Sequence, residues 1–313
     1  MSRSRGTAVA AALLLAALAA AGCGLGPGKE VGSVELTVTR EFGAQPVLES
    51  SVEATESDTV MRVLEGEAKI ATRYGGGFVK SIEGFEEGRR GGRPYDWFFF
   101  VDGVESPIGA ADYELRGGER IWWDYRDWDA TNRVPAVVGS WPAPFSDGYE
   151  GRRHPVAVEC MGRQATCETV RAALEDEGVE VAAGVPDDAI RVLVGVWAQV
   201  REDPAAALIE AGPEESGVFA DFEQGPGGQG VGGGFGLVGL GVDGAPARDL
   251  GPDAGLVAAT RRYEAPPTWV VTGGTPAAVQ AAAGLLDGEH LRDHFAVASE
   301  AGKGTPLPAQ GVR

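Results

Sequence analysis

The sequence predicts two folded domains, an α+β domain followed by a smaller layered α/β domain. The chain of 313 residues is longer than one ordinary small domain. Its first third contains several strand patterns around one short helix, whereas residues 153–300 alternate between strand and helix patterns. Hydrophobic residues make up 43% of the chain and charged residues 23%, which is typical of a folded globular protein.

The N-terminus predicts export and a lipid anchor. Two arginines precede an apolar run from Ala8 to Ala21, which is shorter than a membrane-spanning helix and typical of a signal peptide. The small residues before Cys23 resemble the lipobox of bacterial lipoproteins, which implies that cleavage leaves Cys23 as the lipid-modified first residue. We therefore expect a signal peptide over residues 1–23, a tether over 24–30, and an extracytoplasmic protein anchored by lipid to a bacterial cell membrane. The alternative is an ordinary secretory signal.

Strand patterns open the first domain, which we place at residues 31–130. Apolar and polar residues alternate from Val34 to Thr39, and a second strand pattern from Pro46 to Val52 completes a hairpin. A short helix is predicted between the capping residues Ser57-Asp58 and Gly66. Further strands are expected at residues 70–74, 77–82, 96–101 and 120–125, with Asp102-Gly103 as a hairpin turn. This order of elements predicts a β-grasp-like α+β domain.

Short motifs recur in order through this domain. They are SIEG at 81–84, the aromatic strand at Trp97, GAADY at 109–113, GGE at 117–119 and the closing Trp128. The set resembles the C-terminal domain of transcobalamin and intrinsic factor, in the version found in bacterial surface proteins. The resemblance covers most of residues 34–128 and implies a β-grasp-like domain that covers one face of cobalamin. In the animal carriers a helical domain, for which this sequence has no candidate, supplies the other face.

Aromatic residues are concentrated in the same domain. Five of the seven tryptophans lie between residues 97 and 141, and the strands at 97–101 and 121–125 are apolar on both faces. A helix covers only one face of such a sheet, so the second domain, another protein or a flat ligand must bury the other. Aromatic surfaces with a few polar groups are typical of small-molecule sites. The candidate ligand-binding residues are Trp97, Trp122, Trp123, Tyr125 and Trp128, followed by Tyr74 and Phe78.

The alternative interpretation of these aromatic residues is structural. They would then fill the core and the seam between the domains, and a tryptophan beside Arg126 would form a cation–π pair without any ligand.

Proline and then alternating elements mark the rest of the chain. Residues 131–152 contain three prolines with Trp141 and Phe145, which predicts an extended connector packed on the first domain. We expect residues 153–300 to form the small α/β domain and residues 301–313 a loose tail. The predicted strands are at 155–160, 190–197, 218–222, 236–240 and 269–272, and the predicted helices at 165–178, 203–211 and 275–286.

Two cysteines remain once Cys23 is assigned to lipid. Outside the cytoplasm, an even number of remaining cysteines favours a disulfide, here between Cys160 and Cys167. Two buried free thiols are the alternative. No metal site is expected, because His290 and His294 share a helical face without a third ligand nearby.

Glycines suggest two phosphate sites, and neither pattern is specific. Residues 225–241 are rich in glycine but lack the Gly-Lys-Ser/Thr ending of a phosphate loop, which favours a flexible loop or a hairpin. The turn from Thr272 to Thr275 points backbone N–H groups outward, although turn geometry and helix capping also explain its residues.

The remaining observations narrow the class of function. A net charge of −19 opposes nucleic-acid binding, and no nucleophile with a neighbouring base indicates an enzyme. We predict a lipid-anchored ligand-binding protein without a cofactor of its own. The resemblance implies cobalamin or another flat corrinoid as the ligand, delivered to a membrane importer. The alternative is a non-enzymatic cell-surface adhesion or structural interaction module.

Overall fold

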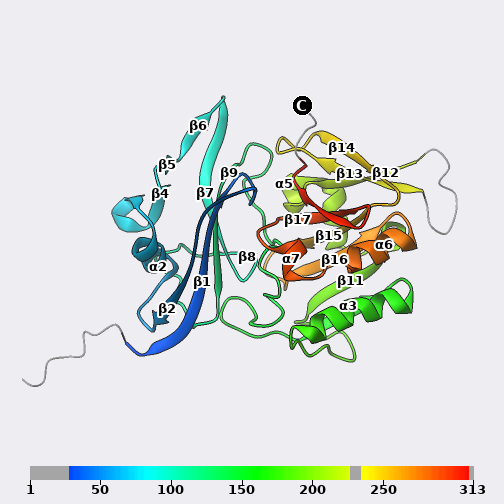
Figure 1. Ribbon diagram of the computed structural model, residues 1–313, viewed down its shortest axis with the longest axis horizontal. Helices are drawn as coiled ribbons and strands as arrows, with labels where there is room; N and C mark the ends of the chain where they lie inside the picture. Colours follow the sequence, from blue (N-terminus) through cyan, green and yellow to red (C-terminus); the bar gives the residue numbers. More distant parts are fainter. Residues whose placement is uncertain (1–27, 226–233, 310–313) are drawn as a thin grey trace, which may run out of the picture.

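The computed structural model describes residues 28–225 and 234–309. The predicted signal peptide, Cys23 and most of the tether lie outside the described residues, as does the middle of the glycine-rich segment. The described chain is a mixed α/β structure in which strands predominate, and two sheet-based halves lie side by side (Figure 1). None of the helices in this part of the chain is long and apolar enough to cross a membrane.

The first domain is built on a mixed sheet. Strands β1 and β2 form the expected antiparallel hairpin, and β1 also pairs in parallel with β9. Strand β9 pairs antiparallel with β7, so that the order is β2-β1-β9-β7-β6, and β8 adds to β7. The bounds are β1 Glu30–Arg40, β2 Gln45–Thr55, β6 Gly88–Arg90, β7 Arg93–Val101, β8 Val104–Glu105 and β9 Arg120–Asp127.

One helix and a small second sheet cover one face of this sheet. Helix α2 (Val60–Glu67) buries Val60, Val63 and Leu64 in the first-domain core. Its cap is Thr59 and not the expected Ser57-Asp58, because the Thr59 hydroxyl accepts the N–H of Arg62. Asp58 instead accepts the N–H of Thr55 at 2.8 Å. The small sheet comprises β3 Ile70–Arg73, β4 Phe78–Ile82 and β5 Phe85–Glu86, with a 3-10 turn, η1 Tyr74–Gly76, between β3 and β4.

The second domain contains a six-stranded sheet in the order β10-β11-β16-β15-β17-β18. Strands β10, β11 and β16 are parallel, and the last three strands run antiparallel to their neighbours. The bounds are β10 Val156–Cys160, β11 Ile190–Val196, β15 Gly255–Thr260, β16 Thr268–Gly273, β17 Ala296–Glu300 and β18 Lys303–Leu307.

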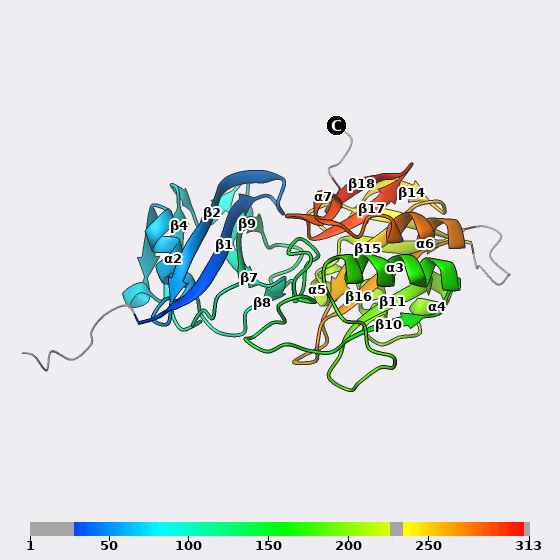
Figure 2. The same ribbon diagram turned by 60° about the horizontal axis from the view of Figure 1, so that its bottom comes forward.

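Different layers cover the two faces of this sheet. Helices α3 (Gln164–Asp176) and α6 (Pro276–Ala283) pack on one face (Figure 2). On the other face lie short helices and a three-stranded sheet. These are α4 Trp197–Val200, η2 Ala206–Ala211, α5 Pro213–Ser216, β12 Ala220–Gln224, β13 Phe235–Leu240 and β14 Pro246–Gly251, and α7 Gly288–Leu291 precedes β17.

Two expectations about the second half are corrected and a third is extended. Residues 303–307 form β18 and not a loose tail, because the buried Leu307 anchors the strand and Ala309 donates its N–H to Leu240 at 2.8 Å. The connector packs on the first domain as expected, since Val137 donates its N–H to the carbonyl of Gly103 at 2.9 Å, but it also packs on the second domain, where the Phe145 ring lies 4.8 Å from the Trp269 ring. The helix expected at 203–211 is a 3-10 helix that begins at Ala206.

A disulfide joins Cys160, the last residue of β10, to Cys167 in the first turns of α3. The Cα atoms are 5.7 Å apart. This spacing lies within the normal range for a disulfide.

Candidate binding cleft

The two domains meet at an apolar seam. Phe100 and Trp122 of the first sheet pack there against Phe219 and Phe295 of the second domain. The Trp122 and Phe295 rings are 5.2 Å apart and nearly perpendicular, a favourable geometry for aromatic pairs. The second domain therefore buries the face of the first sheet that α2 leaves uncovered.

Four of the predicted ligand-binding aromatics are buried. Trp97 is 5%, Trp122 2%, Trp123 3% and Tyr125 0% exposed. Trp122 faces the seam, whereas the other three lie in the core beneath α2, since alternate residues of a strand point to opposite faces. In three of these residues the polar group already has a partner within the protein. Trp97 Nε1 donates to the carbonyl of Phe85, Trp122 Nε1 donates to Thr39 Oγ1, and the Tyr125 hydroxyl donates to the carbonyl of Glu86.

The predicted ligand face is therefore corrected for these four residues. A flat molecule would have to displace core packing to reach them, which is incompatible with a folded first domain. The other three candidates are at the surface: Trp128 is 38%, Phe78 39% and Tyr74 85% exposed. Tyr74 and Phe78 flank the Arg73 guanidinium, at 6.0 and 5.7 Å from its carbon.

A large cleft opens beside the seam. Its volume is about 1390 Å³, and one wall is the turn between β1 and β2. The other wall comes from the second domain, through the β13–β14 turn and the end of the chain. The lining residues are Glu41, Phe42, Gly43, Ala44, Gln45, Gly241, Val242, Asp243, Ala245, Pro246, Ala247, Arg248, His294, Thr305, Pro306, Pro308 and Ala309.

A buried carboxylate holds the first wall in place. Asp124 on β9 is 0% exposed and accepts three hydrogen bonds, from the Thr39 hydroxyl at 2.6 Å and from the N–H groups of Phe42 and Gly43 at 3.0 and 3.1 Å. Burial raises the pKa of Asp124, and these hydrogen bonds oppose the rise. The turn needs this support because Phe42 has a φ of 60°, which is unfavourable for a bulky side chain.

Glycine is required at the next position of the turn. Gly43 has a φ of 85°, and a Cβ there would lie 1.7 Å from the carbonyl oxygen of Asp293. The backbone of the first domain thus contacts the second domain directly at the edge of the cleft.

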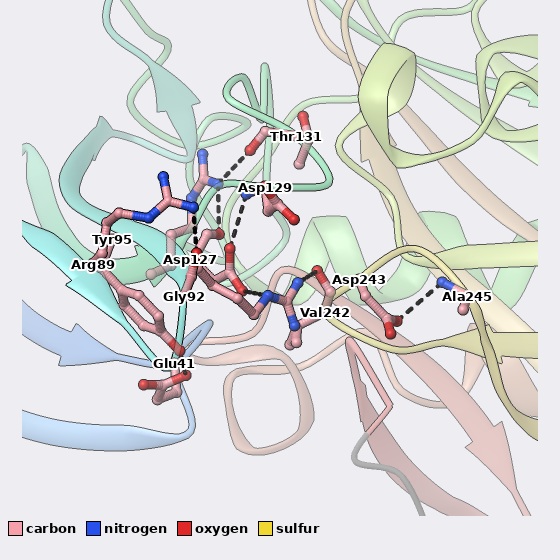
Figure 3. A network of polar contacts seen from close by, with 12 residues as sticks. Glu41, Arg89, Gly92, Tyr95, Asp127, Asp129, Thr131, Val242, Asp243 and Ala245 are labelled. Carbon is pink, nitrogen blue, oxygen red and sulfur yellow. Dashed lines mark hydrogen bonds and ion pairs between the residues drawn. The ribbon is translucent and has the colours of Figure 1, made fainter.

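One polar contact joins the two domains beside the cleft, and Figure 3 shows it together with polar contacts within each domain. Arg93 of β7 pairs with the buried Asp127 and donates to the carbonyl of Val242 in the second domain at 3.2 Å. Tyr95 donates to Glu41 at 3.3 Å, and Ala245 donates its N–H to Asp243 at 3.1 Å. These contacts position charged groups of both domains around one opening.

Burial shifts the titration of groups near the cleft. It raises the pKa of Glu41, although the hydrogen bond from Tyr95 opposes the rise. It raises the pKa of Asp293 to about 6 and lowers that of His294, which favours the neutral form of each side chain. At each of these three positions, burial disfavours the charged form of the side chain.

The two histidines considered for a metal site have separate roles. His290 Nδ1 lies 2.8 Å from Asp287, the cap of α7, whereas His294 lines the cleft. In residues 28–225 and 234–309, no group of three or more His, Cys, Asp and Glu side chains is arranged to hold a metal ion.

Sequence reasoning missed the cleft. Its walls come from residues 41–45, about 200 residues before residues 241–248 in the chain, and from His294 and residues 305–309 farther on. None of these segments carries a binding motif. The one local signal in these segments was the glycine-containing turn at 42–44, which directly follows the first strand and forms part of one wall of the cleft.

A family model matches part of the first domain. Residues 57–127, from α2 to the end of β9, match the family model described as Domain of unknown function (DUF4430). The match covers less than half of the chain and lies within the region that resembles the transcobalamin C-terminal domain. A search of curated proteins finds no match.

Proposed function

We propose that this protein is a lipid-anchored, extracytoplasmic binding protein that captures a large small-molecule ligand in the cleft between its two domains. The observation that carries the proposal is the cleft itself. Ligand sites occur preferentially between domains, and a volume of about 1390 Å³ exceeds the roughly 300–1,000 Å³ of typical ligand pockets. A ligand of that size has room between walls that the apolar seam holds together.

The proposed ligand class is a corrinoid, delivered to a membrane importer. The first domain supports this choice through its motifs and through the order β2-β1-β9-β7, with β1 parallel to β9, as expected of a β-grasp-like domain. The cleft adds what the sequence lacks, namely a second wall that replaces the helical domain of the animal carriers. Its polar groups, among them Gln45 and Arg248, suit the amide-rich rim of a corrinoid.

Equilibrium dialysis against cyanocobalamin and cobinamide tests the proposal, with residues 1–23 removed from the chain. Ala44→Trp and Ala245→Trp introduce large side chains at exposed positions on opposite walls of the cleft. Each is expected to weaken binding by at least about tenfold, or about 1.4 kcal/mol. Ala71→Trp, at an exposed position on β3, is the matched control and should leave the affinity unchanged.

The outcomes separate the parts of the proposal. If the chain binds a corrinoid saturably and neither cleft variant weakens that binding, the ligand binds elsewhere and the cleft is refuted as the binding site. Absence of saturable binding for both corrinoids would refute the ligand class.

A second candidate function is an interaction module on the cell surface. The burial of Trp97, Trp122, Trp123 and Tyr125 favours it, because a structural role for these aromatics is what that function predicts. Its contact surface would be the exposed Tyr74. Under this alternative, Tyr74→Ala would reduce adhesion of cells carrying the protein, whereas the two cleft variants would not.

A further inference from the structure

A second cavity lies in the second domain, at the carboxyl ends of β10, β11 and β16. Its volume is about 330 Å³. After β10 the chain passes to α3 on one face of the sheet, and after β11 it passes to α4 on the other face. Adjacent loops that leave a parallel sheet toward opposite faces open a crevice between them, and open α/β sheets bind their ligands in such crevices.

This cavity is separate from the cleft between the domains. Gly274, just after β16, packs so closely on β13 that a Cβ would lie 1.8 Å from the carbonyl oxygen of Phe235. Phe235 begins β13, and the other end of that strand leads to Val242 in the cleft. The two cavities are therefore at opposite ends of β13, and Figure 2 shows α3, α4 and α6 together on the far side of the second domain.

The lining of this cavity combines an apolar body with one cation. Met161, Val196, Ala198, Pro276 and Val279 supply hydrocarbon, and Arg163, Thr166 and Gln199 supply the side-chain polar groups. The Thr166 hydroxyl already donates to Gln280 Oε1 at 2.7 Å.

Arg163 and Gln199 are both exposed, and among the described residues neither side chain has a hydrogen-bond or ion-pair partner within the chain. Arg163 is the charged one of the two, in a domain rich in carboxylates. The Cys160–Cys167 disulfide spans the turn that carries Arg163, and so restrains one wall. A restrained wall lowers the entropic cost of ordering a bound ligand.

We propose that this cavity binds a small carboxylic acid with a branched hydrocarbon body, with the carboxylate on Arg163 and the hydrocarbon against Met161, Val196 and Val279. A planar guanidinium binds a carboxylate with two parallel hydrogen bonds. The volume limits the ligand to a size well below that of the molecule proposed for the cleft. The inference does not depend on the function proposed for the cleft.

Methionine methyl NMR provides a local readout. The chain has three methionines: Met1 in the predicted signal peptide, Met61 buried in the first domain, and Met161 in the cavity. The chain without residues 1–23, labelled at the methionine methyl groups, is titrated with 4-methylpentanoate and with the uncharged 4-methylpentanamide. We expect the Met161 resonance to shift with the acid in a saturable way, and the Met61 resonance to stay constant as the internal control.

Three variants test the roles of the lining. Arg163→Gln is expected to weaken binding of the acid by about five- to tenfold and to leave that of the amide unchanged. Ala198→Phe fills the cavity and should abolish both responses. Arg262→Gln removes an exposed arginine elsewhere in the domain and should have no effect.

Two results would overturn the inference. One is a constant Met161 resonance throughout the titration with the acid. The other is a loss of affinity on Arg163→Gln that is equal for the acid and the amide, because the guanidinium would then not recognise the carboxylate.

Discussion

Asp124→Asn tests whether the buried carboxylate organises the wall of the cleft. The substitution keeps the size of the side chain and replaces one oxygen with an NH2 group. If the remaining oxygen stays with Thr39 and Gly43, the NH2 group faces the N–H of Phe42, so that one hydrogen bond is lost and a buried donor is left unsatisfied. The opposite orientation loses two bonds and is less favourable.

The expected loss of stability follows from this geometry. An unsatisfied buried donor costs about 1–3 kcal/mol, and loss of a hydrogen bond to a charged group adds to it. Removal of a charge from a fully buried position offsets part of that cost, because burial disfavours the ionised form. We therefore expect the free energy of unfolding to fall by about 1–3 kcal/mol.

Urea unfolding at neutral pH, followed by tryptophan fluorescence, measures the effect. The urea concentration at the midpoint of unfolding should fall, while the slope of the free energy of unfolding against urea concentration is unchanged. Asp243→Asn is the matched control, because Asp243 accepts a single N–H at an exposed turn of the same cleft and asparagine retains that acceptor. Its effect should lie within about 0.5 kcal/mol. An effect of Asp124→Asn as small as that of the control would refute the reasoning.

Three further predictions address the domains separately. Burial raises the pKa of Asp102 from its ordinary value of 3.8 to about 8, so the stability that its neutral form contributes is complete below about pH 4 and is lost progressively as the pH rises to about 8. Thermal unfolding at a series of pH values should therefore show a smaller loss of stability between about pH 4 and about pH 8 in Asp102→Asn. Replacing Cys160 with Ser and Cys167 with Ala should cost about 2–3 kcal/mol in urea unfolding, because a closed loop is lost from the unfolded state; no change on substitution would mean that the bond is absent in solution. Trp122→Ala should lower the free energy of unfolding by about 3–5 kcal/mol and Trp128→Ala by less than about 1 kcal/mol, since the first side chain is 2% and the second 38% exposed. Equal effects of the two substitutions in calorimetry would contradict the burial of Trp122 at the seam.

Local patterns predicted most of the secondary structure. The alternation from Val34 to Thr39 lies within β1, the continuous apolar run from Ile190 lies in β11, and Thr275 caps α6 by accepting the N–H of Ala278. Each of these signals comes from residues close together in the chain, whose burial or capping depends on strand and helix periodicity. Strands β15, β17 and β18 were missed. Residues of β15 and β17 that pair in the sheet are about 40 positions apart in the chain, and such a pairing leaves no local sequence pattern.

The candidate site was much less predictable. The concentration of aromatic residues correctly marked the centre of the first domain, but composition cannot distinguish a tryptophan in a core from one in a cleft. Trp122 and Trp123 are neighbours on β9, yet one faces the seam and the other the core beneath α2. The second domain covers Trp122 and the first-domain core beneath α2 encloses Trp123, so neither is open to a ligand.

The sequence by itself determined that the first domain is organised around an aromatic strand pair, and it indicated an exported chain with a disulfide-compatible cysteine pair. The tertiary structure alone decided where a ligand has room. Periodicity records which side of a strand is buried, but a cavity is the space left between segments that approach from distant parts of the chain. The contact between Gly43 and Asp293, at the edge of the cleft, joins residues 250 positions apart, and no local pattern could have placed them together.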